Sequence, residues 1–146
     1  MYKKMIGLVL AGILSAGAVM AADGWLTDFE KAKQTAEELK RPILLDFTGS
    51  DWCGWCIKLD KEVFSKKEFK DFAKDNLVLF MADFPRNKKQ QSEAEKKQNE
   101  ALMEKYGARG YPTIFLLKAD GEVIAKTGYK PGGAAAYVKH LQELLK

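Results

Sequence analysis

From Asp23 onward, apolar residues recur at helical spacing and then in short continuous runs, and this alternation repeats along the chain. Spacings of about three to four residues are typical of amphipathic helices, and runs of roughly five apolar residues are typical of strands covered on both faces. The pattern predicts strands over residues 43–47, 77–81, 113–117 and 122–126. It predicts helices over residues 27–40, 66–74 and 134–145, a helix that begins near Cys53, and a surface helix in the second half of residues 86–104.

Residues at the ends of these segments carry capping and turn signals. Thr27 and Glu30 form a capping box at the first helix, and we expect Ser65 to cap the helix over residues 66–74. Gly107 is expected to end the surface helix in a left-handed conformation, and residues 119–121 to form a hairpin turn.

This order of elements predicts a single α/β domain. The first two strands should lie parallel through a helical crossover, and the last two should pair as an antiparallel hairpin. The sequence contains no internal repeat and no low-complexity linker, so we expect residues 22–146 to form one domain.

The first 21 residues have the pattern of a secretory signal peptide. Lys3 and Lys4 precede an apolar, small-residue segment over residues 5–19, and Ala21 offers a cleavage site with Ala22 as a close alternative. An uncleaved membrane anchor is the competing interpretation, because the apolar run only reaches the lower limit for spanning a bilayer. Its small residues favour cleavage, so we expect a periplasmic or otherwise exported protein without a membrane contact after cleavage.

The charge of the chain excludes two classes of partner. The formal net charge is +4, and two of these charges lie in the predicted leader. Lysine and glutamate are interleaved along the rest of the chain. A balance this mild indicates neither nucleic acid nor a membrane surface as the partner.

Cys53 and Cys56 are the only cysteines. A disulfide between them would close a very small loop and stabilise the fold by about 2 kcal/mol, so a purely structural role is disfavoured. Zinc would need further N or S ligands, and we interpret the one histidine, His140, as a solvated helix residue. Ile57 after Cys56 excludes covalent haem attachment. A reactive dithiol and a copper(I) site both stay open.

Three stretches of the chain together resemble the thioredoxin family. They are PILLDFTGSDWCGWC at residues 42–56, YGARGYPTIFLL at residues 106–117 and DGEVIAKTGY at residues 120–129. The resemblance implies a three-layer α/β sandwich, with a central mixed sheet of about four strands flanked by helices. The predicted leader and the long polar segment indicate an exported member of the family.

Thiol–disulfide exchange needs one thiolate that attacks and a second thiol that resolves the mixed disulfide. Cys53 should lie at the start of a helix, where free N–H groups and the helix dipole favour negative charge. Cys56, one turn further on, should be more buried and less ionised. We therefore assign attack to Cys53 and resolution to Cys56. No cofactor is expected beyond this redox-active pair, so a separate protein must donate electrons.

Asp46 is the second candidate catalytic residue. It lies in an apolar strand, where burial should raise the pKa of its carboxyl group. In the family, a buried carboxylate at the matching place helps to move the proton of the resolving cysteine. The segment between Asp46 and Cys53 is one residue longer than in ordinary thioredoxins, and a partly solvated acid at the strand end is the alternative. We interpret Asp51, within this longer turn, as a surface residue.

The resemblance also implies a substrate-binding surface. In the family, a cis-proline faces the cysteine pair and exposes the preceding backbone to an extended substrate, and Tyr111, Pro112 and Thr113 match that loop. An ordinary turn proline is the alternative. Around the cysteines we expect Trp52 to shield the pair, and Gly54 and Trp55 to face the substrate.

The sequence predicts a thiol–disulfide oxidoreductase that acts on proteins with disulfides or thiols, with reduction favoured over oxidation. Isomerisation of disulfides by the dimeric route would need an added dimerisation domain. We expect this protein to be a monomer. The alternative is a binding module of the same fold that grips unfolded chains or copper(I) without turnover. The polar segment over residues 86–100 is either a solvated helix or a partner-selecting surface.

Overall fold

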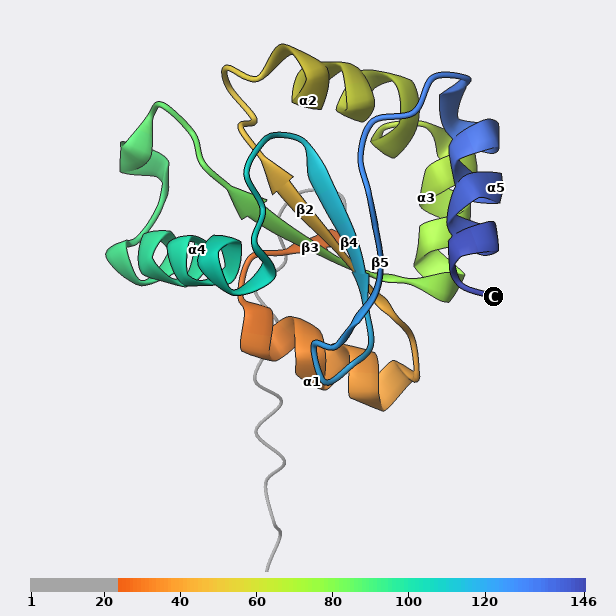
Figure 1. The fold of residues 1–146 in the computed structure, drawn as a ribbon, viewed down its shortest axis with the longest axis horizontal. Coiled ribbons are helices and arrows are strands. Elements are labelled where there is room, and N and C mark those ends of the chain that lie inside the picture. Colours follow the sequence, from red (N-terminus) through yellow and green to blue (C-terminus); the bar gives the residue numbers. More distant parts are fainter. Residues whose placement is uncertain (1–23) are drawn as a thin grey trace, which may run out of the picture.

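The computed structural model describes residues 24–146 of the chain. The predicted signal peptide, its cleavage site and the start of the domain at residue 22 lie outside the described residues. Five strands form one mixed sheet in the order β1-β3-β2-β4-β5 (Figure 1). The strands are β1 (Trp25–Leu26), β2 (Ile43–Thr48), β3 (Val78–Asp83), β4 (Thr113–Leu117) and β5 (Val123–Thr127).

Helices cover both faces of this sheet (Figure 1). They are α1 (Phe29–Leu39), α2 (Gly54–Leu59) with its π-helical continuation η2 (Asp60–Phe64), α3 (Lys67–Asn76), the short 3₁₀ turn η3 (Lys88–Gln90), α4 (Glu93–Tyr106) and α5 (Gly133–Leu144). None of the helices within residues 24–146 combines the length and the apolar composition that crossing a membrane requires.

The predicted strand directions are confirmed. Strand β2 pairs in parallel with β3 and antiparallel with β4, and β4 pairs antiparallel with β5. The sheet has one strand more than expected, because Trp25 and Leu26 pair in parallel with β3. Two residues are too short a run to show any periodicity. Their burial beside β3 therefore becomes visible only in the folded chain.

Alternation along β2 divides the core into two clusters. Ile43, Leu45 and Phe47 pack with α1 and α4 on one face, whereas Leu44 packs with η2, α3 and α5 on the other. Successive side chains of a strand point to opposite faces. Asp46 therefore belongs to the same face as Leu44, on the side of α2 and η2.

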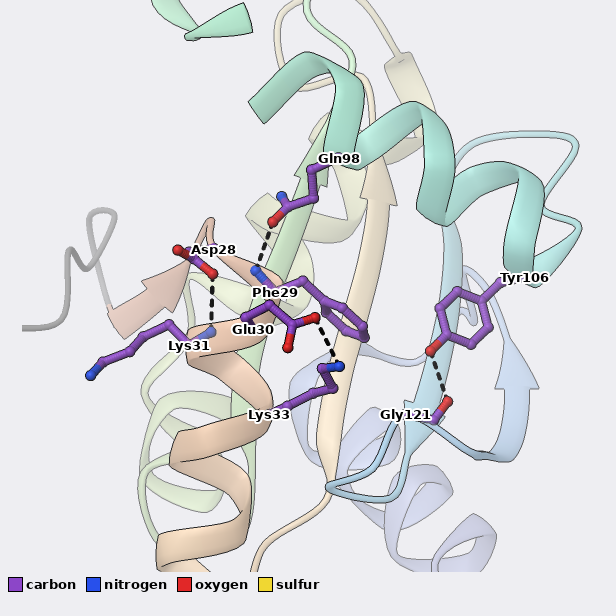
Figure 2. Close-up of polar contacts among 8 residues, drawn as sticks. All are labelled: Asp28, Phe29, Glu30, Lys31, Lys33, Gln98, Tyr106 and Gly121. Atoms are coloured by element: carbon purple, nitrogen blue, oxygen red, sulfur yellow. Dashed lines mark hydrogen bonds and ion pairs between the residues drawn. The ribbon is translucent and has the colours of Figure 1, made fainter. Parts of the chain in front are cut away.

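Two of the predicted helix caps are wrong. Asp28, not Thr27, caps α1, and its carboxylate accepts a hydrogen bond from the Lys31 amide at 3.0 Å (Figure 2). Helix α3 begins after Lys66 without a side-chain cap. Ser65 instead follows the end of η2 and donates its hydroxyl to the Lys61 carbonyl, because the preceding helix runs through Phe64.

Helix α4 is anchored at its middle and at its C-terminal end, by two residues that Figure 2 labels. The Gln98 amide, near the middle, bridges the start of α1, accepting from the Phe29 N–H at 2.8 Å and donating to the Thr27 carbonyl at 2.9 Å. At the C-terminal end, the Tyr106 hydroxyl donates to the Gly121 carbonyl at 2.7 Å. The predicted left-handed end of this helix is confirmed, since Gly107 has φ of 65°.

Candidate active site

The cysteine pair lies where the C-terminal end of β2 leads into α2. Cys53 is the N-cap of α2, as the sequence predicts, and its Sγ accepts a hydrogen bond from the Cys56 amide at 3.3 Å. The two cysteines are joined in a disulfide, with their Cα atoms 5.2 Å apart. Cys53 is 6% exposed and Cys56 5%, so the two residues differ little in burial in the oxidised protein.

The turn before Cys53 is closed by Gly49. The Gly49 carbonyl accepts hydrogen bonds from the Cys53 amide at 2.8 Å and from the Trp52 amide at 3.2 Å. A Cβ atom on Gly49 would lie 2.5 Å from the Trp52 indole, a distance that no real contact tolerates. Gly49 therefore lets the Trp52 ring lie directly on the turn that positions the cysteines.

Asp46 is buried on the face of the sheet that α2 and η2 cover. Its side chain is 4% exposed, and its Oδ1 has no hydrogen-bond partner. Burial raises the pKa of Asp46 from 3.8 to about 8, and the nearby carboxylates of Asp83 and Asp60 act in the same direction. The alternative of a partly solvated acid is therefore not what the structure shows.

A cavity of about 310 Å³ lies between the buried carboxyl group and Cys56. Asp46 and Cys56 both line it, and Asp60, an exposed residue of η2, lines it as well. A cavity of this size, lined by polar as well as apolar side chains, has room for several water molecules between Asp46 and Cys56.

The segment around Pro112 contacts Trp52. The Tyr111–Pro112 peptide bond is cis. The ring of Tyr111 lies 5.5 Å from that of Trp52 and 5.5 Å from that of Phe84. The Thr113 hydroxyl donates to the Gly110 carbonyl at 2.7 Å, which closes the loop before β4.

Trp55 forms a second aromatic contact, with the loop after β5. It is 57% exposed, and its ring centroid lies 5.1 Å from that of Tyr129. The Lys58 ammonium group lies 5.0 Å from the Trp55 ring and 5.3 Å from the Tyr129 ring. The Tyr129 hydroxyl donates to the Glu62 carboxylate at 2.6 Å. Trp55 thus presents an apolar surface beside the cysteines, while Trp52 is 37% exposed.

Two parts of this arrangement were not identified from the sequence. Asp60 lies four residues after Cys56, on the same face of the helix, and this spacing was the available signal that both line the cavity. Tyr129 lies far from Trp55 in the chain, and its place at the end of the thioredoxin-like stretch over residues 120–129 was the only available signal. Gly54 leaves the surface beside Cys53 open, because a Cβ atom at this position would meet no other atom within 4 Å.

His140 is not a solvated residue, contrary to the sequence-based interpretation. Its Nε2 lies 2.8 Å from the Thr127 hydroxyl, and its ring lies 5.8 Å from that of Tyr137. The side chain is half-buried because α5 packs against β5 at this point. Within residues 24–146, no group of three or more histidine, cysteine or acidic side chains is arranged to hold a metal ion.

Comparisons with known proteins agree with this geometry. The family model of the thioredoxin-like domain matches residues 29–143. The chain is 37% identical to the disulfide bond reductase DsbH of Chlamydia pneumoniae, over 88% of this chain and 76% of DsbH. It is 31% identical to the thiol:disulfide interchange protein DsbD of Photorhabdus laumondii, over 73% of this chain but 17% of DsbD.

A solved structure of a DsbH oxidoreductase superimposes with a TM-score of 0.79 at 33% identity, and covers 97% of this chain and 94% of its own. The predicted α/β sandwich is therefore confirmed as a thioredoxin-like fold. The relatives named here are disulfide oxidoreductases. Because the family model also matches most of the chain, the chain belongs to the thioredoxin-like family.

Proposed function

We propose that this protein is an exported thiol–disulfide oxidoreductase that reduces disulfides in client proteins. The Cys53 thiolate attacks one sulfur of the client disulfide, forms a mixed disulfide and releases the first client thiolate, which takes up a proton. Cys56 then attacks the Cys53 sulfur and releases the second client thiol. The client gains two electrons, and the Cys53–Cys56 disulfide is left for a separate protein donor to reduce.

One observation carries the assignment of the attacking residue. Cys53 is the N-cap of α2, and its sulfur already accepts the Cys56 amide at 3.3 Å. A hydrogen bond to sulfur and the positive end of the helix both favour the thiolate over the thiol. Cys56 lies inside the first turn and lines the same cavity as Asp46, which supports a proton transfer between them.

Asp46 is suited to accept the proton of Cys56. A carboxyl group with a pKa of about 8 can hold and release a proton near neutral pH, whereas an ordinary aspartate cannot. When Cys56 attacks the mixed disulfide, it must lose its proton, and the cavity offers a route to Asp46. The role of Asp46 is therefore to deprotonate Cys56 in the resolving step.

Client chains have two places to contact. Tyr111, Pro112 and Thr113 form the segment that an extended substrate would pair with. The exposed Trp55 and the half-buried Tyr129 form an aromatic surface beside the cysteines. Aromatic residues of this kind dominate the energetics of many protein interfaces. The reducing direction is supported by the similarity to a disulfide bond reductase, and export by the leader pattern.

Insulin reduction in dithiothreitol tests the proposed function. The wild-type protein should accelerate insulin precipitation, and Cys53→Ser should show only the dithiothreitol background. Equal rates would instead support a binding module without turnover. Equilibration with glutathione buffers gives the direction: a potential near about −270 mV indicates a reductase, and one near about −120 mV an oxidant.

A further inference from the structure

The segment over residues 84–92, which we call the basic loop, lies beside the cysteine turn. Its sequence is FPRNKKQQS, with three cationic side chains and no acidic one. Arg86, Lys88 and Lys89 are all exposed. The segment follows β3 and precedes α4, so it begins at the same end of the sheet as the turn that leads to Cys53.

Hydrogen bonds fix the basic loop to that turn. The Phe84 amide donates to the Thr48 carbonyl at 2.8 Å, and the Trp52 indole donates to the Phe84 carbonyl at 2.7 Å. The Asp51 carboxylate accepts the amides of Arg86 at 2.9 Å and Asn87 at 3.0 Å. The turn that is one residue longer than in ordinary thioredoxins therefore serves to hold this loop.

Three acidic side chains around the basic loop already have partners. Asp51 binds two backbone amides of the loop, and these bonds, more than the Arg86 charge, lower the pKa of its carboxyl group. Asp83 accepts hydrogen bonds from the amide and the hydroxyl of Ser50. Glu93, which feels the charge of Lys88, pairs with Lys96 at 2.7 Å.

The three cations of the basic loop thus remain available to a partner. Within residues 24–146, none of them lies within 4.0 Å of a carboxylate oxygen in an ion pair. The Arg86 guanidinium lies over the Trp52 ring, 5.6 Å from its centroid. A stacked guanidinium keeps its N–H groups free for a carboxylate while the ring limits its movement.

We propose that the basic loop selects client proteins that carry acidic residues close to the disulfide being reduced. This inference rests on the proposed function and adds a substrate class to it. Trp52 precedes Cys53 directly, and its contact with Tyr111 links the loop to the segment beside Pro112. A client disulfide bound at Cys53 therefore brings its flanking residues next to Arg86, where aspartate or glutamate is favoured by charge.

The experiment compares two disulfide-linked peptides of equal length, one with aspartate and glutamate around the cysteines and one with serine and glutamine. Reduction rates are measured for the wild type, for the triple variant Arg86→Gln/Lys88→Gln/Lys89→Gln, and for a control triple variant Lys97→Gln/Lys139→Gln/Lys146→Gln. The control removes the same charge from exposed positions elsewhere.

We expect the wild type and the control to reduce the acidic peptide about threefold faster or more, and the basic-loop variant to reduce both peptides at similar rates. Added salt should lower the wild-type ratio of the two reduction rates, acidic peptide over neutral peptide, toward one. Equal wild-type rates for both peptides, or a preference that the basic-loop variant keeps, would overturn the inference and leave the proposed function intact. Failure of the wild type to reduce either peptide would overturn the proposed function itself.

Discussion

Asp46 and Cys56 line the same cavity, although Asp46 lies inside a central strand and Cys56 in the first turn of the next helix. The carboxyl group has an oxygen without a hydrogen-bond partner, and burial raises its pKa to about 8. A buried group in this state destabilises the fold when it is ionised. Perturbed carboxyl groups of this kind cluster at functional sites, and this one shares its cavity with a cysteine.

Stability should therefore depend on pH through Asp46. Its pKa is raised from 3.8 in the unfolded chain to about 8 in the folded protein, so the folded state binds the extra proton. The stability that protonated Asp46 provides is complete below pH 3.8 and is lost as the pH rises through about 8. The slope of this loss approaches at most about 1.4 kcal/mol per pH unit.

Asp46→Asn removes that dependence, because asparagine does not titrate. Urea unfolding from pH 4 to pH 9 should show that the variant gains stability relative to the wild type as the pH rises. The same variant should slow insulin reduction about tenfold or more at neutral pH, because the resolving step loses its base. Parallel stability curves for the two proteins would show that Asp46 does not titrate in this range.

The contact between Gly49 and Trp52 predicts a second effect. Gly49→Ala forces the indole away, since the added Cβ would lie 2.5 Å from it, and the hydrogen bond from Trp52 to the Phe84 carbonyl is then strained or lost. We expect a loss of about 1–3 kcal/mol in the free energy of unfolding. Gly54→Ala is the matched control, because its Cβ would meet nothing within 4 Å, and it should leave the urea midpoint nearly unchanged.

Gln98 hydrogen-bonds α4 to the start of α1. Gln98→Ala leaves the Phe29 amide and the Thr27 carbonyl without their partner, and should lower the free energy of unfolding by about 1–2 kcal/mol. Gln142→Ala, on the exposed side of α5, is the control and should change it little. A small effect of both variants in urea unfolding would show that α4 is held by its apolar contacts alone. A deletion of residues 88–98 from the polar segment would also remove Gln98. Its effect on the choice of partner could therefore not be separated from its effect on folding.

Trp55 supplies the exposed aromatic surface next to Cys53. Trp55→Ala should lower kcat/KM for insulin about tenfold, mainly by raising KM, because truncation of a large aromatic anchor weakens client binding. Hydroxyethyl disulfide is too small to span this surface, so its reduction rate should fall much less. An equal fall for both substrates would instead place Trp55 in the chemistry of the cysteine pair.

The sequence was informative where the physical signal is local. The apolar run of β2, the turn with its two cysteines, and Gly107 each carry a backbone or burial preference that a short window reveals. Asp46 could be recognised because a charged residue in such a run is unusual. The choice between Thr27 and Asp28 as the cap could not be made in the same way, since both residues are good caps.

The missed features depend on contacts between distant segments. Asp51 is an exposed turn residue, as the sequence predicts, but the sequence does not show that its carboxylate accepts hydrogen bonds from the amides of Arg86 and Asn87. His140 reads as an exposed helix residue, yet its imidazole meets Thr127. Asp60 lines the cavity together with Asp46 of β2, a neighbour that lies outside its own helix. No local pattern encodes these pairings, so only the folded structure reveals them.

The central claim is that Cys53 attacks the client and that Cys56 resolves the mixed disulfide. Trapping the intermediate tests it most directly: the reduced Cys56→Ser variant is mixed with a disulfide-containing client, and the products are mapped by mass spectrometry. We predict a stable mixed disulfide between the client and Cys53, and only a trace of adduct at Cys56 in the reduced Cys53→Ser variant. Comparable adducts on both variants, or none on Cys56→Ser, would contradict the account.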